Sequence, residues 1–235
     1  METNAEKTKL ITNKTSDINK RIQVNGQELE TVASFKHLGS VVSDEDSKPQ
    51  ILTRMVQMTA ALTRLKSVWN DRSVSLSFRI RLMFSLVKSI FLYACKSWAL
   101  TAELERRIRA MEMRCYRKIL RIAYKGHVTS AKICAKIQRA IGPDEDLLTI
   151  ATRHKLQWFR HVSRSSGLAR TTLQGTVKGE RRQDSQKKRW EDSIRKWTGL
   201  KFANSQRAVG NREKRKKLLV KSSVVPQRSL RLKNR

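Results

Sequence analysis

The apolar positions near the start of the chain fall in short runs broken by turn residues, which indicates strands. Residues 7–13 ("KTKLITN") and residues 34–42 ("SFKHLGSVV") each predict one strand. Between them, Asn25 and Gly26 suit the positive φ angles of a type I′ turn. Residues 21–32 therefore predict a β-hairpin with a two-residue loop.

The loop length fixes the register of that hairpin. Ile22 then lies opposite Leu29, and Arg21 lies opposite Glu30. An apolar pair and an opposite-charge pair both stabilise an antiparallel ladder, so the side chains agree with the turn.

From residue 51 the apolar positions recur every three or four residues, which predicts helices. The first apolar stripe consists of Ile51, Met55, Met58, Leu62, Leu65 and Trp69. Residues 76–98 are apolar on nearly every face, so we expect this helix to be the buried centre of the domain. Shorter helices are predicted at 128–141, at 141–165 and, with its tryptophans on one face, at 187–197.

The helix predicted at 101–122 separates charge from apolar surface. Thr101 is a suitable N-cap, and Glu103 and Glu105 complement the helix dipole in the first turn. Its apolar stripe consists of Leu104, Ile108, Met111, Cys115 and Ile119. Its cations lie largely off that stripe, namely Arg106, Arg109, Arg114, Arg117, Lys118 and Arg121.

Composition adds a strong positive charge, +31 over 235 residues, and this charge is unevenly distributed. Residues 1–47 carry −2, residues 48–177 carry +18 and residues 178–235 carry +15. Such a charge favours a polyanionic partner, with nucleic acid first and an anionic membrane surface second. The longest apolar run, residues 90–95, is far too short to span a bilayer. Nucleic acid, and not a membrane, is therefore the expected partner.

Three cysteines, Cys95, Cys115 and Cys134, do not form the pattern of a disulfide framework. All three lie in helical patterns with apolar neighbours, so we expect buried free thiols in a reducing compartment. No apolar signal peptide opens the chain, and the expected location is therefore intracellular, in the nucleus or the cytoplasm.

Acidic and histidine clusters do not predict a metal site. Residues 44–46 and 144–146 are acidic and precede helical stripes, where capping explains them. His154 and His161 are about 10 Å apart along one helix, too far for both to bind one metal ion. Cys115, His127 and Cys134 lack the paired spacing of a zinc site. No metal ligand and no catalytic residue is predicted.

Residues 153–164 ("RHKLQWFRHVSR") combine charge with aromatic rings. The cations are Arg153, Lys155, Arg160 and Arg164, and Trp158 and Phe159 could stack on bases. The alternative is that both aromatic rings belong to the core and that the charges form a solvated face.

These segments, in this order, resemble a known family. Residues 4–220 closely resemble the C-terminal part of LINE-type (non-LTR) retrotransposon endonuclease–reverse transcriptases, of the RTE or craniata-like kind. "NAEKTKLI" (4–11) looks like the motif that follows the catalytic aspartates, and "SFKHLGSVVS" (34–43) looks like the primer-grip hairpin. Residues 51–69, 80–100 and 109–122 look like thumb helices, and residues 153–164 and 179–192 resemble the family's C-terminal basic segments.

The resemblance implies roles for several residues. Lys7 and Lys9 would lie beside the incoming nucleotide, and the primer grip would consist of Phe35, His37, Leu38 and Gly39. The implied basic contacts near the C-terminus are Arg181, Arg182, Lys187, Lys188 and Arg189. The partner would be RNA, DNA or an RNA/DNA hybrid, held through its phosphates.

The resemblance also implies four parts. Residues 1–47 would be a residual palm edge with the primer grip, residues 48–125 a thumb-like helical domain, and residues 126–170 a helical C-terminal domain. Residues 171–235 would be a basic, partly disordered tail with a short helix at 187–198. The expected fold class is mainly α, with a small N-terminal antiparallel β-hairpin or meander.

The family's polymerase uses carboxylates that hold Mg²⁺, and this chain contains no Asp-Asp pair. The chain alone is therefore expected to be inactive and to hold no cofactor. It would be a truncated part of the enzyme that retains sequence-independent nucleic-acid binding. Two alternatives stay open, an independent basic helical protein of chromatin or RNA packaging and a non-functional retroelement remnant.

Overall fold

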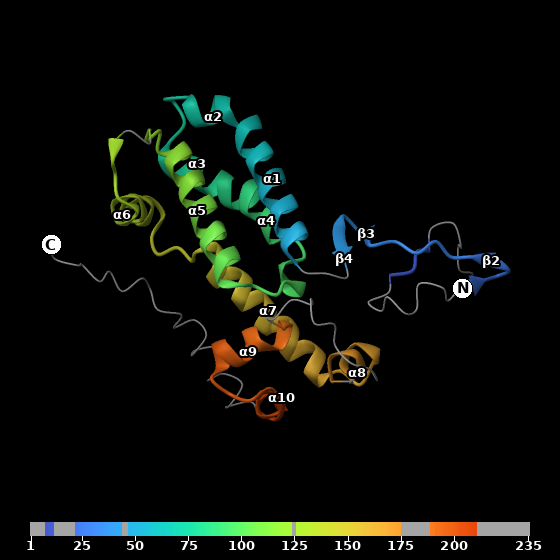
Figure 1. The fold of residues 1–235 in the computed structure, drawn as a ribbon. Coiled ribbons are helices and arrows are strands. Elements are labelled where there is room, and N and C mark those ends of the chain that lie inside the picture. Colours follow the sequence, from blue (N-terminus) through green and yellow to red (C-terminus); the bar gives the residue numbers. More distant parts are fainter. Residues whose placement is uncertain (1–7, 12–21, 44–46, 124–125, 175–188, 211–235) are drawn as a thin grey trace.

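Helices make up most of the molecule, and small antiparallel ribbons supply its β structure, which confirms the predicted fold class. The computed structural model describes residues 8–11, 22–43, 47–123, 126–174 and 189–210. The strands are β1 (Gln23–Val24), β2 (Gln27–Glu28), β3 (Ser34–His37) and β4 (Ser40–Ser43). Figure 1 shows both ribbons to one side of the helices, with β3–β4 the nearer of the two.

The first ribbon is the predicted hairpin. Asn25 and Gly26 have φ angles of 52° and 78°, as a type I′ turn requires. The amide of Leu29 donates to the carbonyl of Ile22 at 2.9 Å, which confirms the predicted register for this pair. Arg21 lies outside the described residues.

Residues 34–42 do not form the single strand that their apolar pattern predicted. They form the β3–β4 hairpin, whose turn residues Leu38 and Gly39 have φ angles of 47° and 76°. Glycine adopts this left-handed conformation readily, whereas leucine does so at a cost in backbone strain. Apolar spacing alone could not reveal the reversal; the resemblance to a primer-grip hairpin implied it.

The strand predicted at residues 7–13 is reduced, among its described residues, to one parallel bridge between Leu10 and Thr31. Lys9 forms an ion pair with Glu30 beside that bridge. The segment is therefore attached to the residues between the two ribbons.

The α-helices are α1 (Lys48–Arg64), α2 (Lys66–Asn70), α3 (Leu76–Leu82), α4 (Ser89–Leu92), α5 (Ala102–Ile119), α6 (Ser130–Ile141), α7 (Leu147–Arg164), α8 (Leu168–Gln174), α9 (Trp190–Thr198) and α10 (Phe202–Gly210). A π-helical segment at 83–88 joins α3 to α4, and a 3-10 turn follows at 95–97. No helix in these described ranges is both long and apolar enough to cross a bilayer.

The helix predicted at 76–98 ends earlier than expected, because α4 stops at Leu92 and Ala94 reverses the chain with φ 59°. One face of the helix is buried in the core, through Ile80, Met83, Val87 and Phe91. Phe78, Leu86 and Tyr93 are exposed. The expectation of a helix buried on nearly every face is thus wrong, because only one side of it meets other helices.

The helix α5 has the predicted form. The Thr101 hydroxyl accepts a hydrogen bond from the amide of Leu104 at 3.3 Å, so it is the N-cap. All five residues of the predicted stripe are buried. The Asp146 carboxylate likewise caps α7 by accepting from the amide of Thr149 at 2.7 Å. The predicted capping role of residues 144–146 is confirmed for this residue, whereas residues 44–46 lie outside the described parts of the chain.

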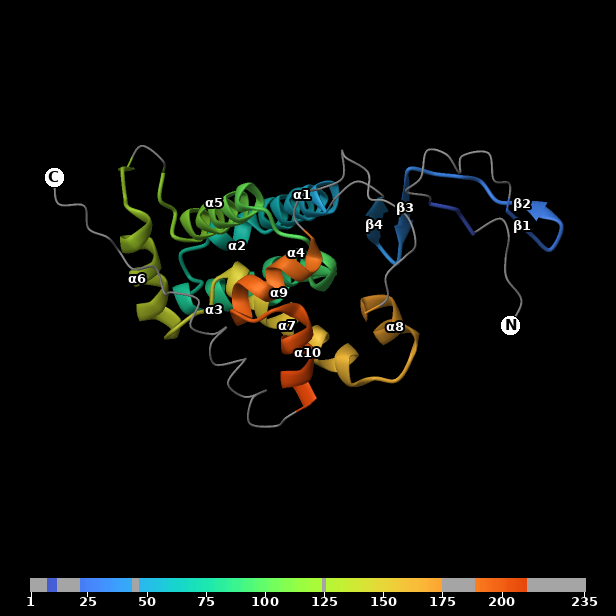
Figure 2. The ribbon, with the colours of Figure 1, turned by 60° about the horizontal axis from the view of Figure 1, so that its bottom comes forward.

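The buried apolar side chains form two clusters, which meet along α7. The main core joins α1 to α6 with the first turns of α7, including Leu147 and Ala151. The second cluster joins Leu156 and Phe159 of α7 to α9 and α10. Figure 2 shows α9 and α10 lying against α7, with α8 to one side. The predicted division into four domains stays a prediction.

The C-terminal segment contains more helix than predicted. The expected helix at 187–198 is observed as α9, and its Ile194 is fully buried. The helix α10, which contributes the buried Val209, was not predicted. The apolar spacing of this helix is hard to recognise in the sequence, because the C-terminal segment around it consists largely of charged residues.

Candidate nucleic-acid interface

The tip of the β3–β4 hairpin is fixed to the helices by Arg54 of α1 and by Tyr93, just after α4. The Arg54 guanidinium donates to the carbonyl of Gly39 at 2.6 Å and lies 4.4 Å above the centre of the Tyr93 ring. The Tyr93 hydroxyl donates to the carbonyl of Leu38. Gln50 adds a hydrogen bond to the Ser40 hydroxyl. The hairpin tip is therefore positioned by side chains that sequence reasoning did not identify.

The four positions likened to a primer grip occur together on this hairpin. Phe35 and His37 stack with their ring centroids 6.3 Å apart. Leu38, at the turn, is 77 % exposed. Lys9 is bound to Glu30 near the other ribbon, and Lys7 lies outside the described residues.

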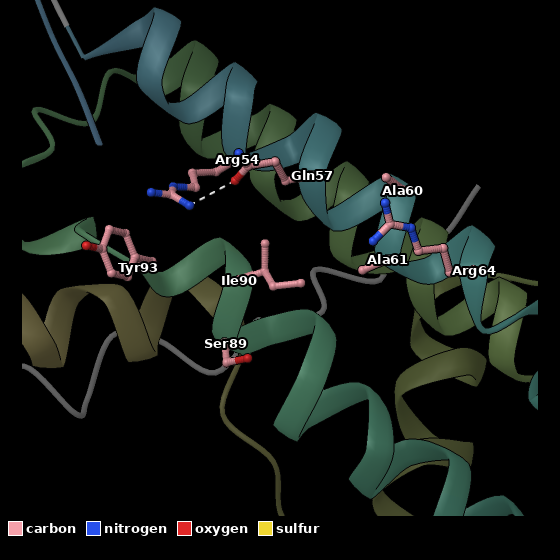
Figure 3. A pocket seen from close by; sticks show the side chains of 8 residues that line it. All are labelled: Arg54, Gln57, Ala60, Ala61, Arg64, Ser89, Ile90 and Tyr93. Atoms are coloured by element: carbon pink, nitrogen blue, oxygen red, sulfur yellow. Dashed lines mark hydrogen bonds between the residues drawn. The ribbon is translucent and has the colours of Figure 1, made fainter. Parts of the chain in front are cut away.

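A groove lies beside the hairpin tip, between α1 and α4. It has a volume of about 490 Å³ and is lined by Arg54, Gln57, Ala60, Ala61, Arg64, Ser89, Ile90 and Tyr93. Figure 3 shows Arg54 and Arg64 extending from α1 toward separate ends of this groove, with Tyr93 at the Arg54 end. None of the lining residues is acidic, so the groove is positively charged.

The cations of α5 divide into two groups. Arg106, Arg109, Arg114 and Lys118 are exposed, and none forms an ion pair with an acid in the described part of the chain. We call these four residues the α5 basic face. Because they lie on one rigid helix, their charges keep a fixed spacing along it.

The other two cations of the predicted helix hold the fold together, Arg117 on α5 and Arg121 two residues beyond its end. Arg117 donates to the carbonyl of Val128 at 3.1 Å and 3.2 Å. Arg121 donates to the carbonyls of Trp69 and Asp71, each at 2.7 Å. Arg79 also reaches the carbonyl of Trp69 at 3.2 Å, and burial lowers its pKa. The sequence could not distinguish these structural cations from the exposed ones, because a bond to a distant backbone carbonyl depends on the tertiary structure.

Lys155 was predicted to contact nucleic acid, and that prediction is wrong. Its side chain is only 1 % exposed and donates to the carbonyl of Trp98 at 2.7 Å. The ammonium also lies 4.4 Å from the centre of the Trp190 ring. A phosphate cannot reach it without unfolding of this region.

The other members of the 153–164 segment occupy different environments. Phe159 is buried in the second cluster, so the core alternative holds for it. Trp158 is partly buried and packs against Trp190 with ring centroids 5.3 Å apart. Arg153 pairs with Glu145 at 2.8 Å. Arg160 is partly buried, and Arg164 is exposed. Of the C-terminal cations, Arg189 is exposed just before α9, whereas Arg181, Arg182, Lys187 and Lys188 lie outside the described residues.

One buried ionic cluster was not predicted. Lys88 lies 3.4 Å from Glu112 and 3.1 Å from Asp144, and the Tyr116 hydroxyl donates to Asp144 at 2.7 Å. Burial raises the pKa of Glu112, opposed by the charge of Lys88. Burial also raises the pKa of Tyr116. Two features of the sequence could have predicted this cluster, namely a lysine in the apolar run 76–98 and a glutamate on the buried side of α5. Each of these side chains requires an opposite charge when it is buried.

Histidine and cysteine side chains provide no metal site among the described residues, where no three His, Cys, Asp or Glu side chains form a suitable group. His154 lies 3.7 Å from Cys95, as a residue at the boundary of the core, and burial lowers its pKa. The predicted burial of free thiols is confirmed for Cys95 and Cys115, while Cys134 is only partly buried. Burial raises the pKa of Cys95 to about 11 and that of Cys115 to about 12, so neither thiol is an activated nucleophile.

Comparisons of the chain with protein-family models, with curated proteins and with solved structures gave no match.

Proposed function

We propose that this protein binds nucleic acid through its phosphates, without reading sequence, in the manner of the thumb and primer grip of a LINE-type reverse transcriptase. The observation that carries the proposal is the α5 basic face, because its four exposed cations have no acidic partner in the described ranges. Unneutralised cations on a rigid helix attract phosphates and release counterions when they bind them. The positive groove beside the hairpin tip also supports the proposal.

Salt dependence tests the proposal most directly. The variant Arg106→Gln/Arg109→Gln/Arg114→Gln removes three charges from the α5 basic face. Each phosphate contact contributes about −0.9 to the slope of log K against log salt on duplex DNA, so the slope should flatten by up to about 2.7. Fluorescence anisotropy on two unrelated duplexes, at four or more salt concentrations, measures the change.

The matched control removes the same number of charges elsewhere. Lys132, Lys136 and Arg139 are exposed on α6, and their replacement by glutamine lowers the net charge equally. If the two triple variants flatten the slope equally, only the total charge matters and the α5 basic face is not an interface. A preference for one duplex of more than about 1–3 kcal/mol would indicate base reading, and a base-reading protein would become the better hypothesis.

The same proposal predicts no polymerase activity from this chain alone, since the sequence contains no Asp-Asp pair to hold Mg²⁺. Primer extension on a primed RNA template, with Mg²⁺ or Mn²⁺, should equal the no-protein control.

A further inference from the structure

We propose that the groove between α1 and α4 binds one strand of nucleic acid as a site separate from the α5 basic face, an inference that rests on the proposed function. The groove has the volume of an ordinary small-ligand pocket, about 490 Å³. A duplex does not fit a space of this size, because its two paired strands would have to enter together. The ligand is therefore a single strand.

The charge of the groove selects an anion. Arg54 is only 8 % exposed, and its guanidinium contacts neutral groups, the carbonyl of Gly39, the Gln57 amide oxygen at 2.8 Å and the Tyr93 ring. Arg64 is exposed and has no ion-pair partner within the described residues. Two cations without a lining carboxylate, beside low-dielectric walls, concentrate positive potential where a phosphate can enter.

The spacing of the two cations selects a strand over a mononucleotide. Arg54 and Arg64 are ten residues apart on α1, which is about 15 Å along the helix axis. Figure 3 shows their guanidinium groups at separate ends of the groove, with Ile90 between them along α4. Stacked nucleotides rise about 3.4 Å each along one strand, so a strand that follows the groove for this length would contain roughly four nucleotides. The exposed Arg64 can contact one of its phosphates directly, whereas the buried Arg54 adds positive potential at the other end.

Tyr93 supplies the stacking surface that such sites use. Tyr93 is 47 % exposed at the end of the groove, although the Arg54 guanidinium lies 4.4 Å from the centre of its ring. The hydroxyl of Tyr93 donates to the carbonyl of Leu38, which holds the ring beside the hairpin tip. A charged groove that follows the backbone, ended by an aromatic ring, is the usual arrangement for binding a single strand without sequence preference.

The test compares a labelled single-stranded 12-mer with a blunt duplex of the same length, at one low salt concentration. Tyr93→Ala should weaken single-strand binding about 5- to 150-fold, the loss typical of one stacked base, and change duplex binding less than twofold. Tyr93→Phe keeps the ring but loses the hydrogen bond to Leu38, so it should bind like the original protein. Arg64→Gln should weaken only single-strand binding, whereas Arg139→Gln on α6 should change neither.

Each other outcome overturns the inference in a distinguishable way. If Tyr93→Phe is as weak as Tyr93→Ala, the residue acts by anchoring the hairpin and not by stacking. If a nucleoside monophosphate competes as well as the 12-mer, the site takes a mononucleotide. If Tyr93→Ala and Arg64→Gln bind the single strand normally while the α5 variant loses duplex binding, the groove is not a site and the proposed function stands. If the original protein binds neither ligand, both proposals fail. Thermal unfolding of every variant identifies loss of fold, and the exposed Arg64 tests the groove even if Tyr93→Ala unfolds.

Discussion

Two buried lysines compensate their charge differently in the two parts of the molecule. In the main core, Lys88 lies among carboxylates, 3.4 Å from Glu112 and 3.1 Å from Asp144. In the second cluster, Lys155 donates to a backbone carbonyl at 2.7 Å and lies near two tryptophan rings. The first lysine belongs to a set of opposite charges that cannot be buried separately. The contacts described for the second include a backbone carbonyl and the faces of aromatic rings.

The difference shows that a count of basic residues overstates the charge available to a partner. Both lysines contribute to the net charge of +31, yet both are almost inaccessible to solvent. Neither can neutralise a phosphate, so each stabilises the fold and not a complex. The two environments should therefore respond differently when the charge is removed.

The largest effect is expected from Lys88→Met, which keeps most of the apolar stem but leaves Glu112 and Asp144 buried without their cation. Loss of one partner from a buried ionic cluster costs about 3–5 kcal/mol. Urea unfolding followed by far-UV circular dichroism measures this loss. The exposed Lys66→Met serves as control and should change the free energy of unfolding by less than about 0.5 kcal/mol. If Lys88→Met loses under about 1 kcal/mol, the carboxylates do not depend on this lysine.

A smaller effect is expected from Lys155→Met, which removes the hydrogen bond to the carbonyl of Trp98. A buried carbonyl that loses its donor costs about 1–3 kcal/mol. Hydrogen exchange should quicken at residues 190–198 and stay unchanged at residues 102–119. If protection falls equally in both segments, Lys155 supports the whole fold and the contrast with Lys88 disappears. The slope of the salt dependence of DNA binding should not change, since this lysine reaches no phosphate.

The pH dependence of stability separates the two environments further, since only the Lys88 cluster contains a buried carboxyl of raised pKa. The pKa of Glu112 lies above its ordinary value of 4.5, because burial disfavours the charged form. The folded state then binds this proton more tightly than the unfolded state does. Glu112 should therefore lower the stability progressively as the pH rises from about 4.5 through the raised pKa. Comparison of the original protein with Glu112→Gln across this window should show a difference that changes with pH; a constant difference would contradict the raised pKa.

The smallest effects are expected in the reactivity of two cysteine thiols, each of which lies near one of the two lysines. Charge from Lys155 acts on Cys95, and charge from Lys88 acts on Cys115. With pKa values of about 11 and 12, both thiols should react with iodoacetamide at pH 8 more slowly than the partly buried Cys134. Because each lysine's positive charge lowers the pKa of the nearby thiol, Lys155→Met should slow the labelling of Cys95 alone, and Lys88→Met that of Cys115 alone. Mass spectrometry of the labelled peptides distinguishes the sites, and equal acceleration of both would mean that the two regions open together.

The sequence predicted the features that depend on local spacing. The stripe of α5, its Thr101 cap and the Asn25-Gly26 turn follow from rules that act within a few residues, and all three are confirmed. The features it did not predict depend on distant partners. Lys155 lies on α7 among exposed cations, and its burial requires the carbonyl of Trp98, 57 residues away.

The candidate site likewise has one part that the sequence could predict and another that it could not. The α5 basic face could be identified from the sequence, because a cation off the apolar stripe of a helix is usually exposed. The groove could not, because Arg54 and Tyr93 meet only when α1 and α4 pack side by side. Arg117 and Arg121 fit the same pattern as their exposed neighbours and yet bind backbone carbonyls of other segments.

The helix α7 joins the two apolar clusters and sets both their separation and their relative rotation. Its 18 residues extend about 27 Å, with one end in the main core and the other against α9 and α10. One residue inserted at its middle would lengthen it by about 1.5 Å and rotate everything beyond by roughly 100°. Leu156 and Phe159 would then point away from α9, although both residues would still be present. The rotational position of the side chains around α7 therefore matters as much as its length. A designer who replaces α9 and α10 by other helices must keep both unchanged.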